Sequence, residues 1–236
     1  MIKESVNREI LIADKIVAEN EEWIELAQYL LDRDKGLRKQ AFVHLNEFLK
    51  STESWTKEEK IRFVAFLLPF FEADSYISFP QPLSEKLVKP TLEEWCLKET
   101  TDSRPFRWYG KFYSGLEHLN KALEINLQDE KARQFLIEKG IDRLYFAVHH
   151  MPEGYIADSD EEVKEDLALI YELQNHISKL SDIKLQRLLT SELENYAELV
   201  KNYVEWKKSG HSDLKKWGEE NHKRVSSGVG VYYYDK

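Results

Sequence analysis

Residues 20–31 read Asn-Glu-Glu-Trp-Ile-Glu-Leu-Ala-Gln-Tyr-Leu-Leu, a pattern that is typical of the whole chain. Asn20 belongs to the residue types that cap helix N-termini, because its side chain accepts a hydrogen bond from a free backbone N–H of the first turn. The apolar residues behind it recur at the three- and four-residue spacing of one helix face: Trp23, Leu26, Ala27, Leu30 and Leu31. The stretch therefore predicts a helix from residue 21 to about residue 31.

Caps and apolar stripes of this kind recur along the chain, so the expected fold class is all-α. Gly36 separates the first helix from a second with a stripe at 37–49, and Thr56 with Glu59 predicts a capping box at the start of a third. Pro69 is expected to kink or end this third helix. Further helices are predicted from Thr91 and at about 105–113, 115–126, 130–147, 158–179, 182–208 and 213–223.

Three short patterns occur twice and in the same order. Glu21-Glu22-Trp23 returns as Glu93-Glu94-Trp95, His44-Leu45-Asn46 with Leu49 returns as His118-Leu119-Asn120 with Leu123, and Glu59-Lys60-x-Arg62 returns as Glu130-Lys131-x-Arg133. The offsets are 72, 74 and 71 residues, which loops of slightly different length in a duplicated unit would explain. We interpret the patterns as an internal duplication, with chance identity among charged helices as the alternative.

The centre of the second half, at about residues 105–134, resembles the tetratricopeptide repeat (TPR). The first helix of that repeat reads Trp-x-x-Leu-Gly-x-x-Tyr, and this chain has Phe106-x-x-Tyr109-Gly110-x-x-Tyr113. The second helix places small residues on either side of a large one, and this chain has Gly115-x-x-x-Leu119-x-x-Ala122, seven residues closer to the first pattern than in the repeat. Small residues at 110, 115 and 122 are expected to let neighbouring helices approach closely.

The resemblance implies a solenoid-like array of antiparallel helix pairs, with a concave face that binds extended peptides or partner helices. It implies no enzyme chemistry. The expected organisation is a first helical unit at 1–75, a second at 91–150 that contains the TPR-like hairpin, and C-terminal helices at 158–224. Prolines at 80, 82 and 90 favour a joint at 74–90.

The tail, 225–236, differs in composition from the rest of the chain. Two glycines, three valines and three consecutive tyrosines make a helix unfavourable and predict an extended segment. Three tyrosines are a large apolar surface, so we expect the tail to pack on the helices of its own chain or of a neighbouring copy.

Composition limits the partners of the protein. The 236-residue chain has 43 acidic and 34 basic side chains and a formal net charge of −9, which disfavours binding to nucleic acid or to anionic membrane. The longest apolar run, 64–71, is too short to cross a bilayer and contains a proline. Cys96 is the single cysteine, and the first residues lack the layout of a signal peptide. These features predict a cytoplasmic protein with a protein or peptide partner, and homo-oligomerisation stays open.

The densest group of aromatic and basic residues lies at 104–113. We expect Phe106, Tyr109 and Tyr113 to face the helical core, which leaves another face for a partner. Aromatic and arginine side chains contribute most of the binding energy at many interfaces. The residues predicted to bind a partner are Arg104, Arg107, Trp108, Lys111 and Phe112. The alternative is that a neighbouring repeat covers this face.

No catalytic, metal-binding or cofactor-binding residue is predicted. His149, His150 and Glu153 resemble a metal site, but adjacent helical residues point about 100° apart, so a histidine bonded to the last carbonyls of a helix is the favoured interpretation. Cys96 has no base beside it in sequence, which favours a buried structural thiol.

The expected function is therefore a protein-interaction module or scaffold that binds a peptide or helix of a partner. Two alternatives stay open. One is a helical metal-dependent enzyme that uses His149 and His150 with nearby carboxylates, and the other is a small acidic inhibitor or immunity-type protein that blocks a basic partner.

Overall fold

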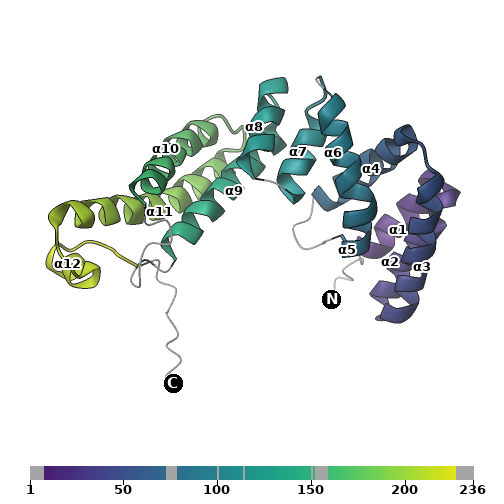
Figure 1. Cartoon of the computed structure of the whole chain (residues 1–236), viewed down its shortest axis with the longest axis horizontal. Coiled ribbons are helices and arrows are strands. Elements are labelled where there is room, and N and C mark those ends of the chain that lie inside the picture. Colours follow the sequence, from purple (N-terminus) through teal and green to yellow (C-terminus); the bar gives the residue numbers. More distant parts are fainter. Residues whose placement is uncertain are drawn as a thin grey trace. The chain divides into compact units, whose positions relative to one another are not determined.

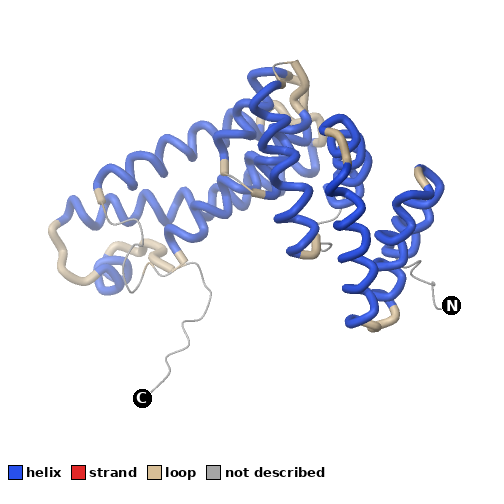
Figure 2. The backbone as a smooth tube through the Cα atoms, turned by 45° about the vertical axis from the view of Figure 1, so that its right-hand side comes forward, coloured by secondary structure: helices blue, strands red, loops and turns tan. Residues whose placement is uncertain are grey.

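The computed structural model describes residues 8–72, 79–99, 101–113, 115–149, 151 and 159–226. Every regular element in these ranges is a helix, and they contain no β-strand, as the blue segments of Figure 2 show. The predicted all-α fold class is therefore confirmed for the described chain. Two compact units make up the chain, Met1–Thr100 and Thr101–Lys236, each with its own helix packing.

Unit 1 begins with three helices that pack side by side (Figure 1). They are α1 (Arg8–Glu19), α2 (Ile24–Asp34) and α3 (Arg38–Ser51), and α2 contacts both of the others. Next comes α4 (Lys57–Glu72), against which α6 (Lys89–Lys98) packs. Short elements join them: the 3₁₀ turns η1 (Glu21–Trp23) and η2 (Thr52–Ser54), the one-turn helix α5 (Gln81–Leu83) and the π-turn η3 (Ser84–Val88).

The helix ends of unit 1 follow the predicted caps. Asn20 accepts a hydrogen bond from the Glu22 backbone N–H at 3.0 Å, and Gly36 takes the left-handed φ of 74° after α2 that glycine adopts without strain. At the start of α4, the Glu59 carboxylate accepts from the Thr56 backbone N–H at 2.6 Å, and the Thr56 hydroxyl accepts from the Glu59 backbone N–H at 3.3 Å. This reciprocal pair confirms the capping box. Pro69 lies inside α4, which the structure describes as far as Glu72.

Aromatic rings fill the core of unit 1. Phe63 of α4 is fully buried at the centre, with its ring centroid 5.0 Å from Trp23, 5.2 Å from Phe48 and 5.4 Å from Trp55. The Trp23 and Trp55 contacts are edge-on, the geometry that the charge distribution of aromatic rings favours. These rings tie η1, α3 and the start of α4 into one core.

The prolines at 82 and 90 do not interrupt the helix that contains them. Helical structure runs from Gln81 to Lys98, with Pro82 in its first turn and Pro90 two residues after the end of the π-turn. In that turn the Lys89 N–H bonds the Ser84 carbonyl, five residues back, and this wider turn accommodates a proline that lacks an N–H. Thr91 is therefore not an N-cap: its hydroxyl donates to the Leu87 carbonyl at 2.6 Å inside the helix.

Helix α6 consequently belongs to unit 1, where it packs on α4. The second unit was expected to begin at residue 91, after a joint at 74–90, but it begins after α6, at Thr101. The predicted joint is wrong for residues 81–90, because the π-turn keeps this proline-containing segment helical.

Unit 2 is a run of helices that pack side by side with their neighbours along the chain (Figure 1). The first three are α7 (Arg104–Phe112), α8 (Leu116–Ile125) and α9 (Glu130–Val148), close to the predicted bounds. They are followed by α10 (Asp160–Ile177), α11 (Ile183–Ser209) and α12 (Leu214–Glu220). Helix α9 is central, because it contacts α7, α8, α10 and α11.

Glycines set two close helix contacts in unit 2. A Cβ built on Gly110 of α7 would lie 2.6 Å from Leu119 of α8, and one built on Gly140 of α9 would lie 2.6 Å from Leu173 of α10. The predicted close approach at Gly110 is therefore confirmed. Gly115 was expected to do the same, but a Cβ there would meet nothing within 4 Å, because this residue lies in the turn before α8.

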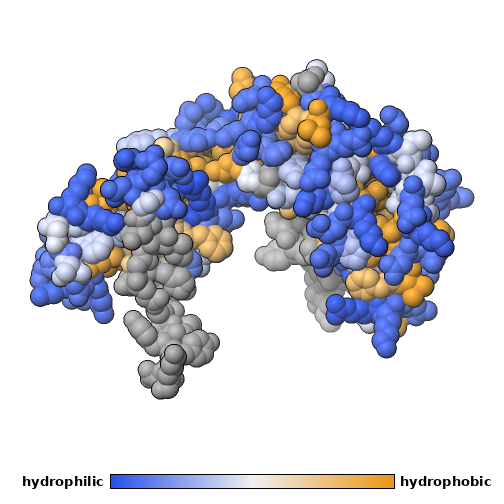
Figure 3. Space-filling view, in the orientation of Figure 1, coloured by the Kyte–Doolittle hydropathy of each residue, from blue (hydrophilic) through white to orange (hydrophobic). Residues whose placement is uncertain are grey.

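Hydrophilic residues cover most of the surface of both units on the face drawn in Figure 3. Within the described ranges, no helix has both the length and the apolar composition that a membrane crossing needs. Of the predicted tail, residues 227–236 lie outside the described residues. The backbone just before it is held by α11, where the Asn202 side chain donates to the Arg224 carbonyl at 2.8 Å.

Candidate interaction site

The predicted partner-binding residues lie on α7, but they do not form one exposed surface. Trp108 is only 1% exposed, so the expectation that it would be available to a partner is wrong. The helix packs against both α8 and α9, and a helix with two neighbours buries more than one face. Lys111 and Phe112 are partly exposed, and the Lys111 ammonium lies 4.1 Å from the ring centroid of Phe135 on α9.

Both predicted arginines on α7 are bound within the chain. The exposed Arg104 pairs with Asp102 at 2.7 Å, and Arg107 pairs with Asp129 at 2.6 Å with both side chains largely buried. Asp129 also accepts from the Ser103 hydroxyl at 2.8 Å and caps α9 through the Ala132 N–H at 3.0 Å. The charge of Arg107 therefore holds the start of α7 against the start of α9.

Asp129 is the residue of this network that sequence reasoning did not single out. An aspartate directly before a helix is a recognisable N-cap, and that signal was present in the sequence. Its pairing with Arg107, 22 residues earlier, depends on how the helices pack. An open groove of about 680 Å³ lies beside this network, lined by the ends of α7, α8 and α9. Its two arginines are neutralised by neighbouring aspartates, Arg104 by Asp102 and Arg107 by Asp129.

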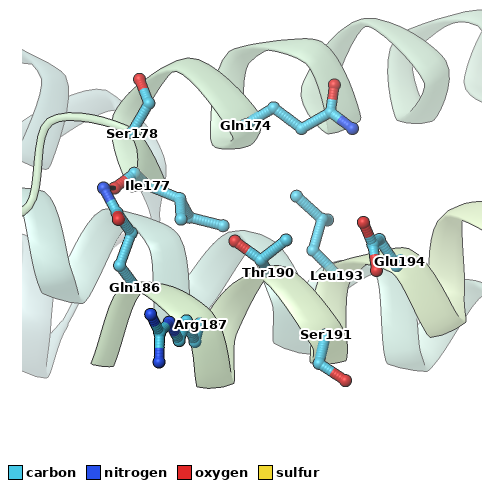
Figure 4. A pocket seen from close by; sticks show the side chains of 9 residues that line it. All are labelled: Gln174, Ile177, Ser178, Gln186, Arg187, Thr190, Ser191, Leu193 and Glu194. Atoms are coloured by element: carbon cyan, nitrogen blue, oxygen red, sulfur yellow. Dashed lines mark hydrogen bonds between the residues drawn. The ribbon is translucent and has the colours of Figure 1, made fainter. Parts of the chain in front are cut away.

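A second groove, of about 400 Å³, lies between α10 and α11 (Figure 4). Its floor is apolar, because Ile177 and Leu193 lie there with 3% and 1% of their surfaces exposed. Its walls are mainly amide and hydroxyl side chains from both helices: Gln174, Ser178, Gln186, Thr190 and Ser191. Arg187 and Glu194 complete the lining. We call this site the α10–α11 groove.

Several hydrogen bonds hold the end of the α10–α11 groove in place. Gln186 of α11 donates to the Ile177 carbonyl at 3.1 Å and so bridges the two helices. Asp182 caps α11 by accepting from the backbone N–H of Lys184 at 2.8 Å. The connection between the helices is fixed to α9, because Glu130 accepts from the Ser181 hydroxyl at 2.7 Å and from its N–H at 3.0 Å. These bonds favour a preformed groove.

The two charged residues of the groove lie at its opposite ends. Figure 4 shows Arg187 near Gln186 at one end, and Glu194 near Gln174 at the other. Both residues are exposed, and neither forms an ion pair within the described part of the chain. The chain therefore leaves one positive and one negative charge beside an apolar floor, which is the arrangement that a polar partner segment can use.

A buried arginine lies on the other side of α10. Arg133 of α9 is 7% exposed, donates to the Leu127 carbonyl, and places one guanidinium nitrogen 3.2 Å from His176 Nδ1. Its Nε has no hydrogen-bond partner among the described residues. Because arginine only donates, His176 Nδ1 must accept, which places the imidazole proton on Nε2. Burial, and then the charge of Arg133, lower the pKa of His176 below its ordinary value.

The described residues that were considered for metal binding or nucleophilic chemistry, His149 and Cys96, lie in environments that favour a structural role. His149 Nδ1 lies 2.8 Å from the Phe146 carbonyl and stacks on Tyr145, which confirms the helix-end interpretation for this residue. His150 and Glu153 lie outside the described residues. In the described ranges, no group of three or more His, Cys, Asp or Glu side chains could hold a metal ion. Burial raises the pKa of the half-buried Cys96 to about 12, so its thiol is not ionised at neutral pH.

No family model matches this chain, and no curated protein or solved structure is significantly similar to it.

Proposed function

We propose that this chain is a protein-interaction module that binds an extended peptide segment of a partner protein in the α10–α11 groove. In this proposal its helix pairs form a solenoid-like array similar to TPR proteins, and an internal duplication accounts for the repeated sequence patterns. A cytoplasmic place of action fits the single cysteine, because one thiol cannot form the intrachain disulfides common in secreted proteins.

The lining of the groove is the observation that carries the proposal. An extended peptide has backbone N–H and C=O groups that need partners, and a carboxamide side chain offers two donors and an acceptor. Gln174 supplies such groups from one wall, and Gln186, one of whose N–H groups already bonds the Ile177 carbonyl, supplies its remaining N–H and its oxygen from the other. The hydroxyl of Thr190 lies between them along the groove. The apolar floor offers a place for one side chain of the peptide. A helical partner would use these walls less, because a helix satisfies its own backbone.

The α7 surface supports the proposal less well. Arg104, Lys111 and Phe112 are at least partly exposed, and their role in contacting a partner stays a prediction. Trp108 is excluded as a contact by its burial, and Arg107 is held by Asp129. No geometry among the described residues favours the metal-dependent enzyme or the acidic inhibitor, so both alternatives stay predictions as well.

Selection of peptides from a random phage-displayed library against the full chain tests this proposal. Enriched peptides, made synthetically with a fluorescent label, should bind the chain in anisotropy titrations. Thr190→Arg should weaken this binding about tenfold or more, because a long side chain on the groove wall would occupy the space of the peptide. Thr190 is exposed and arginine is a good helix former, so the variant should fold normally.

Gln128→Arg is the matched control, because it adds the same side chain to an exposed position in the other groove, beside α7. It should leave peptide binding unchanged. Loss of binding in the Gln128 variant together with full binding in the Thr190 variant would show that the α10–α11 groove is not the site. Failure to enrich any peptide that binds the chain would contradict the proposed function itself.

A further inference from the structure

The two charged residues of the α10–α11 groove restrict the kind of peptide that it would bind. Arg187 and Glu194 are seven residues apart on α11, with Thr190 and Ser191 between them at helical spacing. Residues at these spacings share one helix face. With a rise of 1.5 Å per residue, the two charged positions are about 10.5 Å apart along the helix axis.

The local sequence leaves both charges without a partner on their own helix. One turn away from Arg187 lie Ile183, Lys184, Thr190 and Ser191, none of which is acidic. One turn away from Glu194 lie Thr190, Ser191, Ala197 and Glu198, none of which is basic. Lys184 therefore reinforces the positive end, whereas Glu198 pairs with Arg224 at 3.9 Å and adds little to the negative end. Across the groove, α10 contributes only the uncharged Gln174, Ile177 and Ser178 to the lining.

Several other arginines of the chain, but not Arg133, are neutralised by carboxylates. Arg33 pairs with Glu9 at 2.7 Å, Arg107 with Asp129 at 2.6 Å, and Arg143 with Glu165 at 2.9 Å. Arg187 has no such partner within the described residues, although it borders an apolar floor. A groove with unpaired opposite charges at its ends is electrostatically complementary to a ligand that carries the same two charges in reverse order.

We propose that the occupant is an extended peptide with one acidic and one basic residue three positions apart, flanking an apolar residue. This inference rests on the proposed function. A chain in the polyproline II conformation has three residues per turn and a rise of about 3.1 Å, so residues three apart lie on the same side and about 9.3 Å apart. That distance matches the spacing of Arg187 and Glu194. The conformation has no internal hydrogen bonds, which leaves its backbone groups for Gln174 and Gln186.

Two labelled peptides test the charge pattern against the full chain by fluorescence anisotropy. One contains Pro-Glu-Leu-Pro-Lys-Pro and the other Pro-Lys-Leu-Pro-Glu-Pro, which present the two charges in opposite chain directions. The control peptides carry Glu or Lys at both charged positions. The better of the first two should bind about tenfold more tightly than either control, because each control loses one ion pair and adds one repulsion.

Charge-reversal variants locate the interaction. Arg187→Glu and Glu194→Arg should each weaken binding of the preferred peptide about fivefold. The double reversal should restore binding for the peptide with the opposite direction. Both residues are exposed, so the variants should keep the fold. Lys201→Glu, an exposed change on the same helix outside the groove, reverses one charge and should have no effect.

The outcomes separate this inference from the proposed function. If library-selected peptides bind and Thr190→Arg blocks them, but charge reversal has no effect, the groove binds peptides and the charge pattern is wrong. If the like-charged control peptides bind as tightly as the other two, the inference is likewise wrong. If no library peptide binds the chain, both the inference and the proposed function are contradicted.

Discussion

The α7 surface and the α10–α11 groove both place charged side chains beside apolar ones, but they use the charge differently. On α7, Arg107 is turned inward and paired with Asp129, so its charge joins two helices. In the α10–α11 groove, Arg187 and Glu194 face solvent without ion-pair partners in the described chain. Part of a basic and aromatic run in sequence, Arg107 and Trp108, thus belongs to the internal structure, whereas the groove with sparser charges is the site that we propose for a partner.

Asp129→Ala should give the largest effect and would test the structural role of charge at α7. The variant removes the N-cap of α9 and leaves Arg107 buried without its carboxylate, which should lower the free energy of unfolding by about 3 kcal/mol. Urea denaturation followed by circular dichroism measures the change. Arg187→Ala is the comparison on the groove side, where loss of an unpaired exposed charge should change stability by less than about 0.5 kcal/mol. Equal destabilisation by the two substitutions would contradict the claim that charge is structural at α7 but not in the α10–α11 groove.

Arg133 is a third kind of charged residue, because it is buried without a carboxylate partner among the described residues. Its contact with His176 should give a smaller effect on stability, and one that depends on pH. Its neighbour His176 has a lowered pKa in the folded state, so near and below the ordinary value of 6.5 the unfolded chain binds the proton more readily than the folded chain does. The stabilisation from neutral His176 is complete above about pH 6.5 and is lost as the pH falls below it. Arg133 and Lys179 oppose protonation, whereas Glu172, which Asn120 of α8 contacts, favours it.

The melting temperature should therefore fall between pH 7.5 and pH 5.5 by a few degrees more in the native chain than in the His176→Gln variant. Glutamine keeps an acceptor for Arg133 but does not titrate. Scanning calorimetry of both chains in matched buffers makes the comparison. Parallel pH profiles would show that the Arg133–His176 contact does not influence stability through protonation.

Local signals in the sequence predicted most helices of the fold. Asn20 and the Thr56–Glu59 capping box mark helix starts through bonds between residues two or three apart, so they can be read from sequence. Pro90 was misread, because the π-turn that accommodates it is a backbone adjustment that no residue pattern announces. The predicted boundary between the units was shifted for the same reason.

The candidate site was harder to predict, because its parts come from separate helices. The opposite charges at 187 and 194 are visible in sequence, but Gln174 and Ile177 join them only when α10 packs on α11. Trp108 was misplaced because one amphipathic face was assumed for a helix that has neighbours on two sides. Both errors arise from tertiary contacts, which helical periodicity does not report.

The central claim is that a peptide binds between α10 and α11, and side-chain amide signals in ¹H–¹⁵N NMR test it most directly. Titration with the Pro-Glu-Leu-Pro-Lys-Pro peptide, or with its reversed-charge counterpart if that one binds better, should shift the carboxamide signals of Gln174 and Gln186. Those of Asn126 and Gln128, in the groove beside α7, should stay in place and serve as internal controls. Shifts at Asn126 and Gln128 without shifts at Gln174 and Gln186 would contradict the account.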